Sequence, residues 1–156
     1  MIRAAHHVGM TVESLDRSKA FYIGLLGFEE VFTWNPQADY IGELVGYPEV
    51  DLHSSILRMP GTEVCLELLE YRNVPREDLP RGNANPGMSH LAFYVDDLDE
   101  VFAYLTTNGV QAVSKPVSPT IGPNKGGKAV YLIDPDGFRL ELIESTSSFS
   151  DYGAVC

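Results

Sequence analysis

The stretch His90-Leu91-Ala92-Phe93-Tyr94-Val95-Asp96-Asp97-Leu98-Asp99 decides the fold, because the chain contains a second version of it. The earlier version is His7-Val8-Gly9-Met10-Thr11-Val12-Glu13-Ser14-Leu15-Asp16. The two histidines are 83 residues apart (90 − 7). A second matching pair, 66–70 and 140–144, is 74 residues apart (140 − 66). The sequence therefore predicts two copies of one module, each beginning with a histidine strand and ending with a glutamate strand.

Hydrophobic periodicity and turn residues predict the same order of elements, β-α-β-β-β, in both copies. The fold class is thus α+β, built from two tandem βαβββ modules. We expect the first module at 1–71, a linker rich in turn formers at 72–86, the second module at 87–145, and an unassigned tail at 146–156. Within the first module, residues 35–49 form an irregular or partly helical insertion.

The composition excludes several classes of partner. The chain has 156 residues, 44% of them hydrophobic, and a formal net charge of −11. Such a charge repels nucleic acid and anionic lipid surfaces, and no apolar run reaches the ~20 residues of a membrane span. The start lacks the long apolar region of a signal peptide, and only two cysteines are present, so we expect a cytoplasmic protein without disulfides.

Strand alternation selects four residues with metal-binding side chains. In each module a helix must cover the apolar face of the sheet, so His7, Glu67, His90 and Glu141 project from the other face. If the two sheets curl toward each other, the four groups converge. Two imidazoles and two carboxylates suit one divalent ion, Zn²⁺, Fe²⁺, Mn²⁺, Co²⁺ or Ni²⁺.

Each of these residues also has an ordinary structural explanation. A histidine taken alone is more often a hydrogen-bonded structural residue than a metal ligand. A strand glutamate taken alone is more often solvated, and we expect Glu70 and Glu144 to include side chains of this kind. Joint placement at equivalent points of a duplicated unit favours the metal site, because unpaired buried carboxylates are costly. We expect His6, which has the apolar parity, to be a core residue or a support for His7.

The chain resembles the vicinal oxygen chelate superfamily, which includes glyoxalase I, methylmalonyl-CoA epimerase, extradiol dioxygenases and bleomycin-resistance proteins. The resemblance covers about residues 3–145, and its carriers are His7-Val8-Gly9, Ala20-Phe21-Tyr22 through Leu25-Leu26-Gly27-Phe28, His90, and Asp134-Pro135-Asp136-Gly137 leading to Glu141. It implies paired βαβββ modules in an incomplete eight-stranded barrel around one divalent metal, with ligands at His7, Glu67, His90 and Glu141. It also implies a homodimer and a small-molecule substrate.

Within the superfamily, the chain looks closest to methylmalonyl-CoA epimerase and glyoxalase I-like members. We expect an isomerase, epimerase or lyase that transfers a proton next to a carbonyl, with Glu141 or Glu67 as base. The epimerases use a further carboxylate on the third strand, where this chain has His53-Ser54-Ser55, so His53 is the candidate second base. The alternatives are an Fe(II) extradiol-type dioxygenase and a non-catalytic protein that sequesters a small molecule such as an antibiotic.

Overall fold

The computed structural model describes residues 1–77 and 82–145. It divides the chain into two units, Met1–Leu79 and Pro80–Cys156. The tail expected at 146–156 lies outside the described residues. None of the described helices is long and apolar enough to span a membrane.

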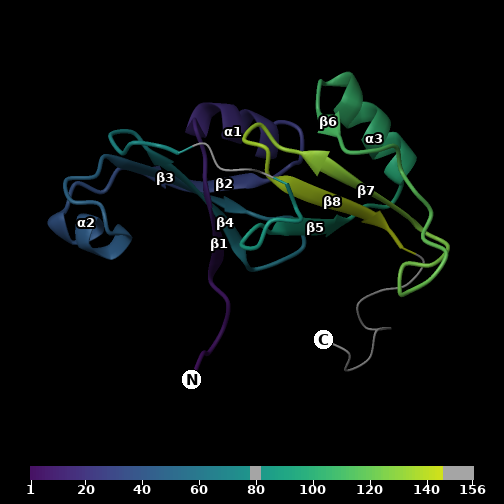
Figure 1. The fold of residues 1–156 in the computed structure, drawn as a ribbon, viewed down its shortest axis with the longest axis horizontal. Coiled ribbons are helices and arrows are strands. Elements are labelled where there is room, and N and C mark those ends of the chain that lie inside the picture. The colour runs from purple at the N-terminus through teal and green to yellow at the C-terminus, as the bar shows by residue number, and fades with distance from the viewer. Residues whose placement is uncertain (78–81, 146–156) are drawn as a thin grey trace. The chain divides into compact units, whose positions relative to one another are not determined.

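Unit 1 consists of a four-stranded sheet with one helix before its second strand and another in the insertion (Figure 1). Its elements are β1 (His7–Thr11), α1 (Leu15–Tyr22), β2 (Glu29–Trp34), α2 (Asp39–Val45), β3 (Leu52–Arg58) and β4 (Cys65–Tyr71). The strand order is β1-β4-β3-β2, in which β1 runs parallel to β4 and the other neighbours are antiparallel.

Unit 2 repeats this plan without the insertion. Its elements are β5 (His90–Tyr94), α3 (Leu98–Thr107), β6 (Gln111–Ala112), β7 (Lys128–Ile133) and β8 (Arg139–Glu144). The strand order β5-β8-β7-β6, with a parallel β5–β8 pair, matches that of unit 1. The predicted α+β class with two βαβββ modules is therefore confirmed. The described residues form two four-stranded sheets and no closed barrel.

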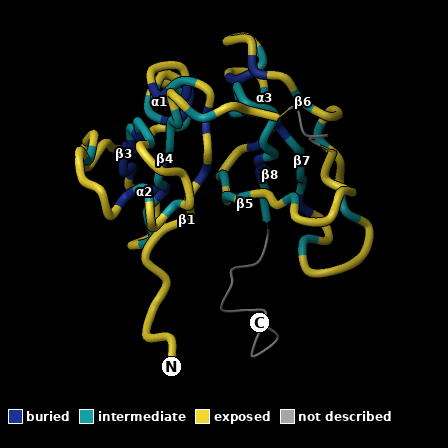
Figure 2. The backbone as a smooth tube through the Cα atoms, turned by 60° about the vertical axis from the view of Figure 1, so that its left-hand side comes forward, coloured by how far each residue is buried: buried dark blue, intermediate teal, exposed yellow. Residues whose placement is uncertain are grey.

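Each unit buries the apolar face of its sheet against its long helix. In unit 1, α1 contacts β3 and β4, where Leu57, Leu66 and Leu68 are fully buried. In unit 2, α3 contacts β8, and Leu132 and Leu140 are fully buried. Figure 2 shows buried positions alternating with more exposed ones along β4 and β8. The opposite face of each sheet is thus left to carry polar groups.

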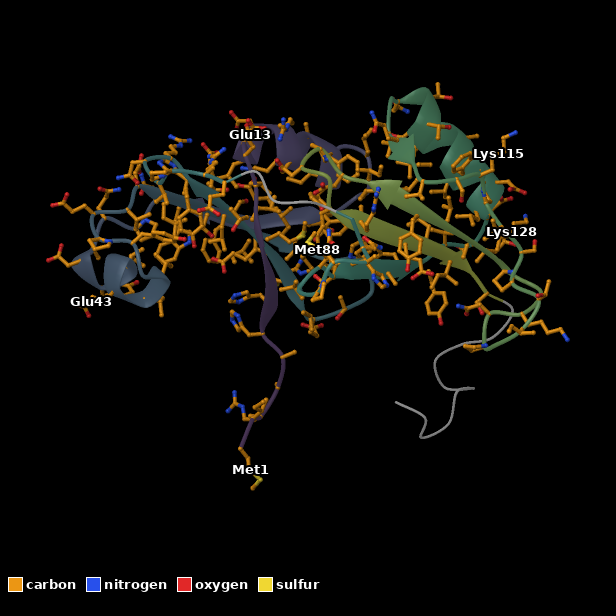
Figure 3. The ribbon with its side chains drawn as sticks, in the orientation of Figure 1. Met1, Glu13, Glu43, Met88, Lys115 and Lys128 are labelled. Carbon is orange, nitrogen blue, oxygen red and sulfur yellow. The ribbon has the colours of Figure 1, made fainter. Side chains whose placement is uncertain are left out.

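The last glutamate of each sheet holds the first turn of the unit's helix. Glu70 Oε2 accepts a hydrogen bond from the Leu15 N–H at 2.8 Å, and Glu144 Oε2 accepts one from the Leu98 N–H at the same distance. A carboxylate at a helix N-terminus satisfies a backbone donor that the helix itself leaves unpaired. Glu144 is also 3.6 Å from Nζ of Lys128, which is labelled in Figure 3. Both carboxylates therefore tie strand to helix, and the Glu144 side chain is at the same time 27% exposed.

Candidate metal centre

In unit 1 the structure brings His7 and Glu67 together. Parallel pairing aligns Gly9 of β1 with Glu67 of β4, and His7 is two residues from Gly9, so its side chain lies on the same face as Glu67. The His7 Nε2 atom is 3.0 Å from Glu67 Oε2. The side chains are 37% and 16% exposed, respectively, so the pair is accessible from solvent yet partly enclosed.

Two further side chains orient this pair. The buried Ser54 hydroxyl on β3 donates to Glu67 Oε1 at 2.7 Å, which leaves Oε2 toward His7. The His6 Nδ1 and His7 Nδ1 atoms are 2.7 Å apart, and this contact leaves the Nε2 of His7 toward Glu67. His6 is exposed, so the core alternative for it was wrong. Hydrogen bonds of this kind fix the orientation of metal-binding groups in known sites.

Unit 2 contains the equivalent pair. Parallel pairing aligns Ala92 of β5 with Glu141 of β8, and His90, two residues from Ala92, therefore lies on the face of Glu141. The His90 Nε2 atom is 3.3 Å from Glu141 Oε2. The side chains are 41% and 20% exposed, close to the values in unit 1.

Tyr131 supplies the hydroxyl that orients the pair in unit 2. It lies opposite Glu141 in the antiparallel β7–β8 pair, and its hydroxyl donates to Glu141 Oε2 at 3.1 Å. Its ring packs edge-on against that of His90, with centroids 5.3 Å apart. Burial and then the Glu141 charge and hydrogen bond raise the pKa of Tyr131, so the hydroxyl stays a proton donor at neutral pH.

The donor atoms of each pair have a separation that fits two ligands of one ion. Ligand nitrogens and oxygens lie about 2.0–2.2 Å from Zn²⁺, so at tetrahedral or octahedral angles two of them lie roughly 2.8–3.6 Å apart. The distances of 3.0 Å and 3.3 Å fall within this range. They equally suit hydrogen bonds between imidazole and carboxylate. No group of three or more potential ligands is assembled within the described residues, so convergence of all four stays a prediction.

His53 lies on the other face of its sheet. It pairs with Glu70 across β3 and β4, whereas Ile56 pairs with Glu67, and directly paired residues share a face. The His53 Nε2 atom is 3.1 Å from Asp51 Oδ1 and 2.9 Å from Asn35 Nδ2. The structure therefore does not bring His53 to the Glu67 carboxylate, and we do not carry it into the proposed mechanism.

The repeated βαβββ units, each with a His–Glu pair on its open face, define a glyoxalase-type protein. The chain belongs to the Glyoxalase/Bleomycin resistance protein/Dioxygenase superfamily, whose model matches residues 4–142. This confirms the resemblance drawn from the sequence.

Several relatives of this chain are named as enzymes. It is 34% identical over 144 residues to a 2-epi-5-epi-valiolone epimerase from Actinomyces sp, covering 90% of this chain and 78% of the relative. It is 34% identical over 142 residues to the lactoylglutathione lyase of Salmonella typhimurium, covering 89% and 90%. A glyoxalase family protein from Bacillus cereus has the same fold, with a TM-score of 0.80, 21% identity and coverage of 94% and 96%.

Proposed function

We propose that the protein is a divalent-metal-dependent enzyme that transfers a proton next to a carbonyl of a small substrate with chelating oxygens, as an isomerase, epimerase or lyase. The observation that carries the proposal is the duplicated His–Glu pair, with Nε2–Oε2 distances of 3.0 Å and 3.3 Å at equivalent places in the two units. The epimerase and lactoylglutathione lyase relatives support this reaction class.

The four residues proposed to hold one divalent ion are His7, Glu67, His90 and Glu141. When bound, the ion would act as a Lewis acid and stabilise negative charge that develops on the substrate oxygens. When the Nε2 atom of each histidine is unprotonated, both atoms that face each other within a pair are acceptors, so a bound cation would relieve their repulsion.

The proton is moved by a carboxylate of this set. We assign the base to Glu141, because the Tyr131 hydroxyl fixes its carboxylate at 3.1 Å and stays protonated at neutral pH. Glu67, fixed by Ser54 at 2.7 Å, is the equivalent group of the other unit and, in its protonated form, would donate its own proton to the opposite face of the substrate in an epimerisation. A lyase or isomerase reaction needs only one of the two carboxylates for both transfers.

The test is proton exchange with solvent. The metal-loaded protein is incubated in deuterated buffer with 2-keto acids, acyl-CoA thioesters and the hemithioacetal of methylglyoxal and glutathione, and deuterium at the carbon next to the carbonyl is followed by NMR. Replacing Glu141 with Gln should slow the exchange by at least about a hundredfold, the usual contribution of a general base. Glu63→Gln, an exposed change outside both pairs, is the matched control.

Two other outcomes would contradict the proposal in different ways. Oxygen consumption with catechols, without deuterium uptake, would identify a ring-cleaving dioxygenase. Metal-free protein that binds a small molecule as tightly as metal-loaded protein, and exchanges no proton, would identify a sequestering protein.

A further inference from the structure

Arg139 on β8 has one guanidinium nitrogen that the described structure leaves without a hydrogen bond. Its Nη1 atom is buried and has no hydrogen-bond partner anywhere in residues 1–77 and 82–145. A buried charged donor without an acceptor is costly, and natural structures rarely retain one without a reason.

The other arginines make this state unusual. Arg17, Arg58 and Arg72, all with more exposed side chains, each pair with a glutamate at 2.8–2.9 Å. The chain has 22 acidic residues for 11 basic ones, so carboxylates are abundant. Arg76 donates to the Tyr71 carbonyl oxygen at 2.9 Å. The buried Nη1 of Arg139 has no such partner within residues 1–77 and 82–145, which indicates that its acceptor comes from outside the described residues.

Arg139 also lies on the face that carries the unit 2 pair. It is aligned with His90 in the parallel β5–β8 ladder and lies two residues before Glu141. Side chains two residues apart on a strand share a face and are separated by about 6.6–6.8 Å. A group held by the guanidinium would therefore lie within the length of one small metabolite from Glu141.

We infer that Arg139 binds an anionic oxygen group, a carboxylate or phosphate, of the substrate. This inference rests on the proposed function, because it places the group on the substrate whose proton Glu141 moves. The planar guanidinium offers two parallel donors that match both anions, which a lysine would not reproduce. The substrate class is then a carbonyl compound that also carries an anion.

The experiment follows the Arg139 side chain itself. The zinc-loaded ¹⁵N-labelled protein is titrated with malonate, with inorganic phosphate and with neutral malonamide, and the arginine Nε–Hε NMR signals are recorded. The Arg139 signal is assigned by its loss in Arg139→Met. We expect it to shift saturably with at least one anion and not with malonamide, and the tighter anion distinguishes carboxylate from phosphate.

Two variants complete the test. Arg139→Met should weaken anion binding by at least about tenfold, the factor for one charge-assisted hydrogen bond, and should not lower Tm, because it removes an unsatisfied buried donor. Arg58→Met, which removes an exposed arginine paired with Glu29, should leave anion binding unchanged.

The inference is overturned if neither anion shifts the Arg139 signal, if malonamide shifts it equally, or if Arg139→Met binds the anions as tightly as the wild type. If the anions bind only the zinc, Arg139→Met and the wild type will bind them equally tightly. The readout involves no turnover, so a protein that exchanges no proton but binds anions through Arg139 refutes the proposed function alone.

Discussion

Replacing Glu70 with alanine removes the carboxylate that holds the first turn of α1. The lost contact is the 2.8 Å hydrogen bond from the Leu15 N–H, together with a 2.8 Å ion pair to Arg72. A hydrogen bond to a charged group contributes about 1.5–3 kcal/mol. Because the Glu70 side chain is only 13% exposed, we expect a loss of about 2 kcal/mol in the free energy of unfolding, which lowers Tm by roughly 4–8 °C in a chain of this size.

The same contact makes the effect depend on pH. Burial raises the pKa of Glu70, but the hydrogen bond from Leu15 and the contacts with Arg72 and His53 outweigh it, so the pKa lies below its ordinary value. A carboxyl with a lowered folded pKa stabilises the protein above its unfolded pKa, about 4.3 for Glu, and loses this contribution as pH falls through the folded value. The deficit of Glu70→Ala should therefore be full at pH 7 and shrink below about pH 4.

Urea unfolding followed by circular dichroism at 222 nm measures both effects. Glu63→Ala, at an exposed position, is the control and should change stability by less than about 0.5 kcal/mol. Equal stabilities of Glu70→Ala and Glu63→Ala at pH 7, or a deficit that stays constant down to pH 3, would refute the assigned role of Glu70.

Three further predictions concern the groups around the His–Glu pairs and the chain near β7. Tyr131→Phe and Ser54→Ala should each weaken metal binding by about tenfold or more, measured by competition with a chelating dye, because each removes the hydroxyl that orients a glutamate; Tyr104→Phe on the exposed side of α3 should not. Metal analysis of the purified protein should give one divalent ion per chain, and a two-to-one excess of chains over metal would contradict the proposed four-residue set. Gly127→Ala should destabilise the protein by about 1–3 kcal/mol in urea unfolding, because its Cβ would lie 2.0 Å from the Glu144 carbonyl oxygen. The control is Gly82→Ala, whose Cβ would lie 3.7 Å from the nearest atom among the described residues, the Asn85 Nδ2.

Most of the correct predictions of the fold and of the His–Glu pairs came from the duplicated motif and from the alternation of residues along the strands. The duplicated motif fixed the element order, and the period of two placed His7 with Glu67 and His90 with Glu141 on one face of each sheet, because alternation does not depend on the details of packing. The helix within 35–49 was harder to place, because its residues show no sustained apolar repeat and include glycine and proline.

The prediction of His53 as a second base followed the comparison with the epimerases and not the alternation of residues along the strand. The chain turns at Pro60-Gly61 between β3 and β4. A two-residue turn there would pair His53 with Leu68 of β4, which faces the helix. The structure pairs it with Glu70, on that same face. The hydroxyl that does contact Glu67 belongs to the next residue, Ser54. Because successive strand residues point to opposite faces, the sequence could have placed Ser54 on the Glu67 face. The roles of Glu70 and Glu144 depend on how each helix begins against its sheet, which no local pattern specifies.

The two halves differ in a way that supplies an optical reporter for unit 1. Trp34, the single tryptophan of the chain, is aligned with Ser54 in the β2–β3 pair, so its indole lies on the Glu67 face of unit 1. Where unit 2 has Tyr131 opposite its glutamate, unit 1 has Ile56. Indole emission should thus follow events at the His7–Glu67 pair, so that the state of unit 1 can be timed without adding a dye.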